Sequence, residues 1–380
     1  MLNRDLRLIF TCNLVGSFGD GLFAFLLPLY IGKSLGAGAV EIGVLYAVLS
    51  LFAALTLFAA GTLADKYDRK KIMIAGWLAW LPAPLIFSLA GDWIQMLPGM
   101  IMWGFWLGGP TSTAYIVTAA DKSEVTLTFT TMSAAWSIGY VFSPALGGHL
   151  AGIIGMRFVF YLAFIFYALA CFTLFFINSQ YGPSSGQTSV RERYSTLRLL
   201  RTRKLLMLSA FFASLMFILM MFRPFVPKFV ADIYRYGDFE IGILGSVSYA
   251  SAAILGVLLG RLGDKSRKSY ALTVSMILGS LSLILLLLSG NFIILVLAFF
   301  LTGGSYITWS LMSAITGPLA PESYRARWIA IPQTLSMFAS FIAPYIGGFL
   351  YDTSPSFPFI LAVAAGLPLA LLAITKMFEE

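Results

Sequence analysis

Asp20 is the residue with the clearest potential for chemistry, because it lies in the middle of the apolar run "NLVGSFGDGLFAFLLPLY". A carboxyl group inside a bilayer is costly unless it is neutral or paired. Removal from water favours its protonated form, so it could take up a proton on one side of a membrane and release it on the other. In the internal repeat described below it corresponds to Leu219, so this carboxyl belongs to one half of the chain only. A structural hydrogen bond is the alternative explanation.

Arg223 is a second ionisable residue within an apolar run, "MMFRPFVPKF". It corresponds to Ala24 in the repeat, one helical turn from Asp20, so an ion pair between Asp20 and Arg223 is one possibility. Binding of an anionic substrate is another. The third is that the side chain extends to the outer membrane surface.

The remaining residue types suggest no metal site, nucleophile or phosphate-binding loop. Cys12 and Cys171 both fall within apolar runs, where free cysteines pack as small hydrophobic residues. We therefore expect no metal and no cofactor.

The composition indicates a chain that lies mostly in lipid. Of 380 residues, 59% are hydrophobic and 11% are charged, whereas soluble domains carry about 25% charged residues. A bilayer-spanning helix needs about 20 mainly apolar residues, and its backbone groups must be bonded internally. We predict an all-α integral membrane protein with twelve transmembrane helices. The predicted spans are 7–32, 38–61, 72–91, 93–119, 126–151, 155–178, 204–230, 238–260, 270–289, 291–317, 327–351 and 356–377.

The basic residues lie mainly between the spans, which argues against a nucleic-acid partner despite the net charge of +8. With the N-terminus inside, all but five of the 25 Lys and Arg residues fall on the inner side. The five exceptions are Lys33, Arg157, Arg223, Lys228 and Arg235. We therefore predict a protein of the cell membrane with both termini in the cytoplasm.

The second half of the chain repeats the first. The matched pairs are Pro28 with Pro227, Glu41 with Glu240 and Asp65 with Asp264 at a shift of 199 residues, and Pro144 with Pro344 at a shift of 200. This predicts two bundles of six helices, residues 1–178 and 204–380, joined by a basic cytoplasmic linker at residues 179–203. Two such bundles are typical of a carrier whose site lies between them.

Two charged loops carry a resemblance to a known family. They read "GTLADKYDRKK" at residues 61–71 and "GRLGDKSRK" at residues 260–268. The first is similar to the G-x-L-A-D-x-x-G-R-K loop of the major facilitator superfamily, with Asp68 in place of the second glycine. The chain resembles this superfamily over nearly its whole length, which implies two pseudo-symmetric six-helix bundles and alternating access.

The resemblance implies that the two loops form a gate on the cytoplasmic side. Asp65 could accept hydrogen bonds from a helix N-terminus, and Arg69 and Lys70 could pair with carboxylates across the bundle interface. A simple excess of positive charge inside is the alternative, but it does not explain the repeated Gly-x-x-x-Asp spacing. The predicted gating residues are Gly61, Asp65, Arg69, Lys70, Gly260, Asp264 and Lys268.

Residues 139–150, "GYVFSPALGGHL", are similar to the G-x-x-x-G-P-x-x-G-G motif of exporters in this family, with Ser143 in place of a glycine. The proline removes one backbone hydrogen bond, and the glycines allow close helix packing. Close packing that says nothing about transport direction is the alternative. The predicted helix-packing residues are Gly139, Pro144, Gly147, Gly148, Pro344, Gly347 and Gly348.

In this family, helices 1, 4, 7 and 10 line the central cavity. The runs "TSTAY" and "GGSYITWS" in the fourth and tenth helices are polar and aromatic, which suits amphipathic organic molecules. Core packing and interfacial aromatic belts are the alternative. The candidate substrate-binding residues are Asn13, Ser17, Asp20, Trp106, Ser112, Tyr115, Arg223, Tyr306 and Trp309.

We therefore expect a secondary active transporter that exports amphipathic or lipophilic small molecules in exchange for protons, with Asp20 as the proton-coupling residue. One alternative is an importer or exchanger of a small organic anion held by Arg223. Another, from a different class, is a membrane-embedded enzyme or receptor. The expected partners are a small-molecule substrate, protons and the lipid bilayer, and we expect a monomer.

Overall fold

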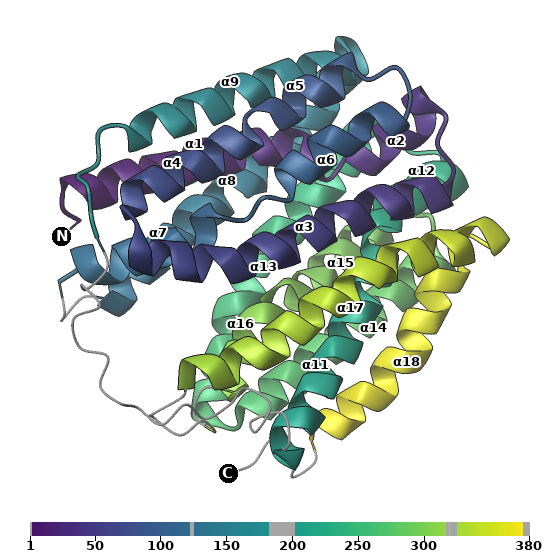
Figure 1. Ribbon diagram of the computed structural model, residues 1–380. Coiled ribbons are helices and arrows are strands. Elements are labelled where there is room, and N and C mark those ends of the chain that lie inside the picture. Colours follow the sequence, from purple (N-terminus) through teal and green to yellow (C-terminus); the bar gives the residue numbers. More distant parts are fainter. Residues whose placement is uncertain (1, 122–124, 182–201, 317–318, 320–324, 375–380) are drawn as a thin grey trace. The chain divides into compact units, whose positions relative to one another are not determined.

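The computed structural model of the chain is built from helices (Figure 1). It describes all residues except 1, 122–124, 182–201, 317–318, 320–324 and 375–380, and within the described residues no strand occurs. The predicted all-α class is confirmed. Most of the linker predicted at 179–203 lies outside the described residues, and the surroundings of Gly61 and the side chain of Asp65 are not described either.

Nine helical segments among the described residues are long and apolar enough to cross a membrane. They are Arg4–Leu35, Ala39–Leu57, Arg69–Leu89, Met156–Leu174, Arg203–Tyr234, Asp238–Lys265, Lys268–Leu288, Phe292–Thr316 and Ile331–Thr353. A further apolar helix, Phe357–Ala373, is shorter. All ten overlap spans predicted from hydropathy.

The prediction of one continuous helix over 93–119 is wrong. The segment consists of η1 (Ile94–Met96), α6 (Leu97–Trp103) and α7 (Gly108–Ala119), which leaves residues 104–107 outside any helix. Glycines at 104, 108 and 109 weaken the helix there, and Pro110 has no N–H to donate into the preceding turn.

The second half of the chain has a helix break at the corresponding place. Here α15 (Phe292–Thr302) is followed by η3 (Gly303–Ile307) and α16 (Thr308–Thr316). Gly104 and Gly303, which stand at the start of the two breaks, are 199 residues apart. The internal repeat therefore extends to the positions where helices are interrupted, which in transporters are favoured places for binding sites.

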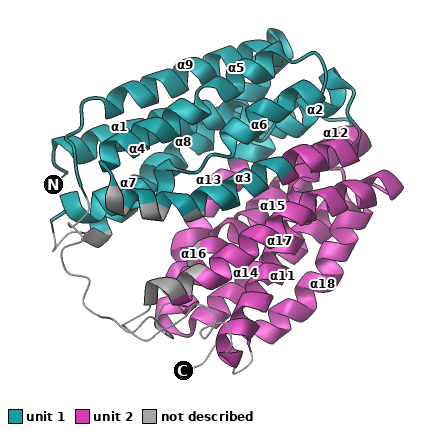
Figure 2. Ribbon diagram, viewed as in Figure 1, with its two compact units in different colours: residues 1–37, 48–189, 235–246 teal, residues 38–47, 190–234, 247–380 magenta. Residues whose placement is uncertain are grey.

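The chain forms two compact units, which Figure 2 shows in different colours. Unit 1 comprises residues 1–37, 48–189 and 235–246, and unit 2 comprises residues 38–47, 190–234 and 247–380. The helices α3 (Ala39–Lys66) and α13 (Asp238–Lys265) each begin in one unit and continue in the other.

In unit 1, α1 (Arg4–Ala24) packs against α8 (Val125–Ile153) and α9 (Met156–Leu174). The other helices that lie wholly in this unit, outside the break, are α2 (Leu27–Leu35), α4 (Arg69–Trp80) and α5 (Pro82–Leu89). An aromatic cluster fills the core, where the ring of Phe23 lies 5.3–6.0 Å from the rings of Trp103, Phe160 and Phe87. Such tilted and edge-on aromatic contacts stabilise packing beyond the burial of area alone.

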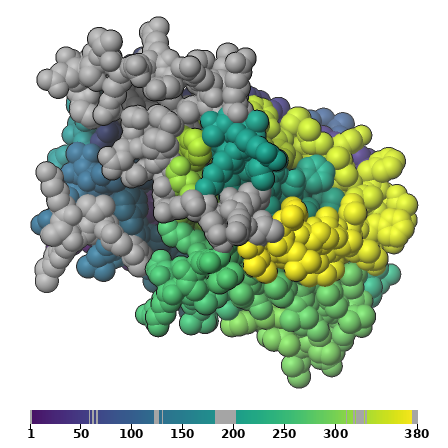
Figure 3. Space-filling model, turned by 90° about the horizontal axis from the view of Figure 1, so that it is seen from below, coloured from purple at the N-terminus to yellow at the C-terminus, as the bar shows by residue number. Residues whose placement is uncertain are grey.

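In unit 2, α11 (Arg203–Phe222) packs against α17 (Arg325–Thr353) and α18 (Phe357–Ala373). Figure 3 shows this end of the unit, with α11 in teal beside α18 in yellow. The remaining elements are η2 (Arg223–Phe225), α12 (Val226–Tyr234) and α14 (Lys268–Leu288).

Glycines explain why α3 and α13 each contribute to both units. In unit 1, a Cβ atom on Gly148 of α8 would collide with the backbone of Asp238 at the start of α13. In unit 2, a Cβ atom on Gly348 of α17 would collide with the backbone of Ala39 at the start of α3. Only a residue without a side chain allows these helices to approach so closely.

The other predicted packing glycines lie at similar contacts. Gly147 lies against the backbone of Leu22, and Gly347 lies against the backbone of Met221, 199 residues further along. Gly139 lies against Ser17 in α1. Both prolines of the motif lie within helices, Pro144 in α8 and Pro344 in α17, and their carbonyl groups contact Gly242 and Gly43 respectively.

Replacing Gly147 by alanine should destabilise the protein by about 1–3 kcal/mol, because the added methyl group meets the backbone of Leu22 and not a movable side chain. The matched control is Gly152→Ala, since Gly152 lies in the same helix with open space around it. That change should be neutral or stabilise the helix by up to about 1 kcal/mol. Thermal unfolding of the purified variants measures both, and equal midpoints would contradict the packing argument.

Candidate functional site

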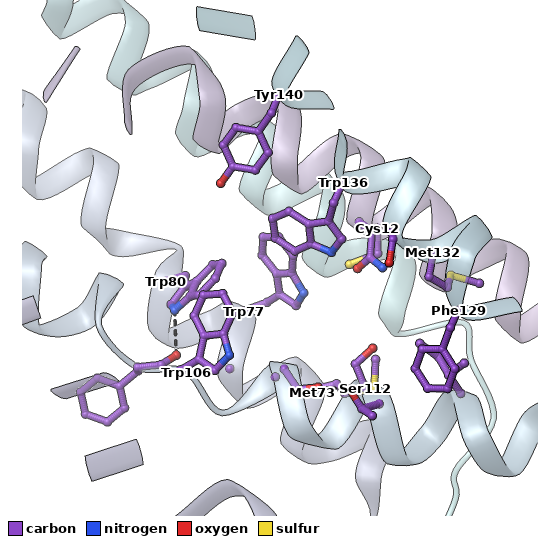
Figure 4. A pocket seen from close by; sticks show the side chains of 18 residues that line it. Cys12, Met73, Trp77, Trp80, Trp106, Ser112, Phe129, Met132, Trp136 and Tyr140 are labelled. Atoms are coloured by element: carbon purple, nitrogen blue, oxygen red, sulfur yellow. Dashed lines mark hydrogen bonds between the residues drawn. The ribbon is translucent and has the colours of Figure 1, made fainter. Parts of the chain in front are cut away.

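Unit 1 contains a cavity of about 510 Å³, which Figure 4 shows from close by. It is bordered by α1, α4, α7, α8 and the break between α6 and α7. Its lining residues are Cys12, Asn13, Met73, Gly76, Trp77, Trp80, Phe105, Trp106, Gly108, Gly109, Ser112, Thr113, Ile116, Phe129, Met132, Ser133, Trp136 and Tyr140. A volume of this size accommodates a drug-sized organic molecule.

The helix break brings Trp106 to the cavity. A break within a membrane frees backbone groups, which must find other partners. The indole Nε1 of Trp80 donates to the carbonyl oxygen of Phe105 at 2.7 Å, as the dashed line in Figure 4 shows. The backbone N–H of Trp106 donates to the hydroxyl of Thr56 at 2.9 Å. These backbone groups of the break therefore have hydrogen-bond partners, and the break places the side chain of Trp106 in the cavity wall.

The cavity lining is aromatic and uncharged. The rings of Trp77 and Trp106 lie 5.5 Å and 5.2 Å from the ring of Trp80, and Trp136 stacks on Tyr140 at 6.1 Å. None of the eighteen lining side chains, all from the described part of unit 1, is a Lys, Arg, Asp or Glu. Such a surface binds planar, amphipathic or lipophilic molecules by stacking and burial of apolar area.

Asp20 is buried next to this cavity, and three side chains donate hydrogen bonds to its carboxyl group. The indole Nε1 of Trp103 donates to Oδ1 at 2.9 Å, and the hydroxyl of Tyr167 donates to the same oxygen. The hydroxyl of Tyr140 donates to Oδ2. Because Tyr140 also lines the cavity, one side chain connects the cavity to the carboxyl group.

The structure brings three of the candidate residues, Asn13, Trp106 and Ser112, together around this cavity. Ser17 is buried instead between helices, and its hydroxyl donates to the carbonyl oxygen of Leu14 at 3.1 Å. Tyr115 is also buried away from the cavity lining. Its hydroxyl donates to Asp5 at 2.8 Å, and it lies 2.9 Å from the carbonyl oxygen of Asn178.

Sequence reasoning missed the contribution of the third and fifth predicted helices to the cavity. Trp77 and Trp80 are three residues apart, and Trp136 and Tyr140 are four apart. These spacings place each pair on one helix face. The signal was therefore present, but it does not distinguish a cavity wall from a packed core.

In the charged loop of unit 1, Arg69 at the start of α4 bonds to several neighbouring segments, and we call this set of contacts the clamp. Arg69 is 5% exposed, and its Nε donates to the carbonyl oxygen of Ala64 at 3.3 Å. Its Nη1 donates to the carbonyl oxygen of Ala114, to Thr118 Oγ1 and to Gln180 Oε1, at 3.1, 2.8 and 2.7 Å. Arg69 therefore ties the ends of α3 and α7 to the segment that follows α9.

The second charged loop repeats part of this clamp in unit 2. Lys268 donates to the carbonyl oxygen of Ala314 at 3.0 Å, which corresponds to the contact between Arg69 and Ala114 in unit 1. Among the other predicted gating residues, Lys70 donates to the carbonyl oxygen of Phe175 at 2.8 Å. Asp264 is exposed, and Gly260 has open space around it. A role in gating stays a prediction for all of them.

In unit 2, Arg223 and Tyr306 are in contact. The guanidinium carbon lies 4.5 Å from the ring centre of Tyr306, and Nη2 donates to both the carbonyl oxygen and the hydroxyl of Ser305 at 3.0 Å. Trp309 is partly buried on α16 in the same unit. Because Asp20 belongs to unit 1, the proposed pair between Asp20 and Arg223 stays a prediction.

Comparison with known proteins identifies relatives along the whole chain. A family model described as Major Facilitator Superfamily matches residues 9–237 and 216–380. A multi-drug resistance efflux pump PmrA homolog of Lactococcus lactis is 26% identical over 364 residues, which cover 88% of this chain and 85% of the relative. The quinolone resistance protein NorA of Staphylococcus aureus is 23% identical, with 96% of this chain and 95% of the relative covered.

Solved structures show the same fold. The chain is similar to the crystal structure of a point mutant of the nucleoside transporter NupG with a TM-score of 0.85 and 14% identity, over 98% of this chain and all of that chain. A POT family transporter in complex with 5-aminolevulinic acid matches with a TM-score of 0.80 and 13% identity, over 99% and 97% of the two chains.

Replacing Arg69 by glutamine should lower stability on the order of 3 kcal/mol, because several charge-assisted hydrogen bonds are lost and their acceptors are left buried. The control is Lys71→Gln, which removes the same charge from an exposed position two residues further along α4 and should change stability little. Thermal unfolding of both variants tests this. If the two midpoints shift equally, the effect comes from net charge and not from the clamp.

Proposed function

The chain belongs to the major facilitator superfamily, as its charged loops predicted, and we propose that it exports amphipathic or lipophilic small molecules in exchange for protons. Membership makes it a multi-pass membrane transporter, and the predicted fold of twelve helices in two pseudo-symmetric bundles agrees with its structural neighbours. We place it in the cell membrane with both termini in the cytoplasm, in accordance with the distribution of its basic residues.

The observation that supports this function best is the connection between the uncharged tryptophan cavity and Asp20. The cavity has the volume and chemistry for an amphipathic molecule, and it offers no fixed charge for a sugar phosphate or a small inorganic ion. The two efflux proteins that the chain is similar to favour export over import.

In this proposal the carboxyl group of Asp20 carries the proton, and its hydrogen bonds favour one of its two oxygens for that proton. Oδ1 already accepts from Trp103, whose indole can only donate, and from Tyr167. Oδ2 has Tyr140 as its donor. We propose that a proton taken up by the carboxyl group goes to Oδ2, which has fewer donors, and that the hydroxyl of Tyr140 then turns from donor to acceptor.

This rearrangement links the proton to the substrate. When Asp20 is ionised, Tyr140 donates its hydroxyl proton toward Oδ2 and away from the cavity. When Asp20 is protonated, Tyr140 accepts from Oδ2 and can donate to a molecule in the cavity or to water. A substrate seated against Tyr140 therefore has different hydrogen bonds available in the two protonation states, and this difference supplies the coupling free energy.

The clamps at Arg69 and Lys268 serve the conformational change in this proposal. Arg69 donates to the carbonyl group of Ala114 in α7, and Lys268 donates to that of Ala314 in α16. Each of these two helices begins directly after one of the helix breaks. Together with Asp65, the two clamps are the proposed parts of the cytoplasmic gate.

Asp20→Asn should abolish the response of transport to a pH gradient while substrate binding persists. Asparagine keeps the size of the side chain and resembles the protonated carboxyl group, with one acceptor oxygen and a donor in place of the other, but it cannot exchange a proton. We expect gradient-driven ethidium transport in proteoliposomes to fall about tenfold or more. The control is Asp92→Asn, a partly exposed carboxyl group in the segment before η1 that accepts hydrogen bonds from Gln95. Full gradient dependence in Asp20→Asn would mean that another group carries the proton.

Tyr140→Phe should reduce gradient-driven transport about tenfold while ethidium still binds, because the ring stays in the cavity wall and only the hydroxyl that contacts Asp20 is lost. Tyr161→Phe is the matched control, since Tyr161 lies exposed on α9. Transport and binding of the same dye are measured on both variants. A parallel loss of binding in Tyr140→Phe would assign the hydroxyl to substrate recognition alone.

A further inference from the structure

We propose that unit 2 holds a separate oxyanion site centred on Arg223, which takes the carboxylate of an aromatic organic acid. The site is formed by the guanidinium of Arg223, the backbone break at Ser305 and the rings of Tyr306 and Tyr249. It lies within one unit and is independent of the proposed export and proton coupling.

The first argument is charge. Arg223 is partly buried, and no carboxylate among the described residues lies within 4.0 Å of its guanidinium. The four described carboxylates of unit 2 are Glu41, Asp232, Asp264 and Asp352. Of these, Asp232 pairs with Lys228 at 2.9 Å, and Asp352 accepts from the backbone N–H of Ala39. A cation withdrawn from water without a counter-ion is costly, and a bound anion removes that cost.

The second argument is the unused hydrogen-bonding capacity of the guanidinium. Nη2 is fixed by the carbonyl oxygen and hydroxyl of Ser305, whereas Nε is buried and has no hydrogen-bond partner. A buried donor without an acceptor is rare and costs about 1–3 kcal/mol. Because Ser305 holds one end of the guanidinium, the remaining donors are pre-oriented for an oxyanion.

The third argument is the position of Arg223 at two helix breaks. It begins η2, which interrupts the helix from α11 to α12, and it binds the backbone of η3, which interrupts the helix from α15 to α16. Snorkelling to the membrane surface does not account for this, because a snorkelling arginine keeps its charged end in water. Here Nε is buried and Nη2 is bound to the protein backbone.

The fourth argument is the aromatic surroundings, which define the ligand class. The ring of Tyr306 lies under the guanidinium, and the ring of Tyr249 lies 5.3 Å from that of Tyr306. Both tyrosines are partly exposed, so a ligand can reach them. An acid whose carboxylate meets Arg223 can place an aromatic ring against this pair. The neighbouring cavity beside Ser305, about 40 Å³, is too small for such a molecule.

The site is not part of the repeated scaffold. At the shift of 199 residues, Arg223 corresponds to Ala24, Ser305 to Trp106 and Tyr306 to Leu107. A residue needed only to hold a helix break together would be expected in both halves. The absence of an equivalent arginine in unit 1 indicates chemistry that belongs to unit 2.

The test measures thermal unfolding of the purified full-length protein in phosphatidylcholine nanodiscs with 2-naphthoate or with the neutral 2-naphthamide. A ligand of the native state raises the midpoint in a saturable way. We expect naphthoate to raise it more than naphthamide, because both can enter the aromatic cavity of unit 1 but only the carboxylate meets Arg223. Arg223→Gln should weaken naphthoate binding about 10- to 100-fold, and Arg223→Lys should keep part of the affinity because it keeps the charge but not the planar fork.

Three controls make the result specific. Lys228→Gln removes a nearby charge that is already paired with Asp232 and should leave naphthoate binding unchanged. Trp106→Ala alters the cavity of unit 1 and should leave the excess stabilisation by naphthoate over naphthamide unchanged. Phosphatidylglycerol added to the nanodiscs should not compete with naphthoate.

Equal stabilisation by naphthoate and naphthamide would overturn the proposal, as would unchanged naphthoate binding in both Arg223 variants. If phosphatidylglycerol competes with naphthoate in the wild type but not in Arg223→Lys, the site binds a lipid headgroup. That result would contradict the proposal of an organic acid as the ligand. If Arg223→Gln does not fold, the comparison of Arg223→Lys with Lys228→Gln carries the test. Since transport is not measured, failure here leaves the export proposal unaffected.

Discussion

The structure depends on one constraint, which is that every backbone polar group within a membrane needs a partner even where a helix is interrupted. The break at residues 104–107 is bonded by Trp80 and Thr56, and the break in η3 is bonded by Arg223. Two of these side chains, Trp80 and Arg223, also belong to the candidate sites. Broken helices therefore provide irregular backbone and specific side chains at the same place.

The two halves share a scaffold but differ in chemistry. The glycine contacts of α8 recur in α17, and the contact of Arg69 with Ala114 recurs as that of Lys268 with Ala314. In contrast, the three donors around Asp20 and the tryptophan cluster belong to unit 1, and the free guanidinium donors belong to unit 2. The repeated glycine contacts accordingly serve packing, and we propose binding and coupling roles for the residues without a counterpart.

Most of the fold could be predicted from the sequence. Each helix is indicated by the hydropathy of many residues together, and the repeat is indicated by several matched Gly and Pro positions. Asp20 was identifiable because a carboxyl group in an apolar run is exceptional. Its donors were not, since Tyr140 and Tyr167 are 120 and 147 residues away in the chain. The interruption of the fourth helix was missed because an apolar run of sufficient length looks continuous, although its glycines and Pro110 marked the place.

The central claim is that the proton on Asp20 and the molecule in the cavity influence each other through Tyr140. The most direct measurement is proton release or uptake when ethidium binds to the purified protein in weakly buffered solution, followed with a pH indicator. The account predicts a change in bound protons in the wild type that is absent in Asp20→Asn, although ethidium still binds. An equal change in both proteins, or none in the wild type, would contradict it.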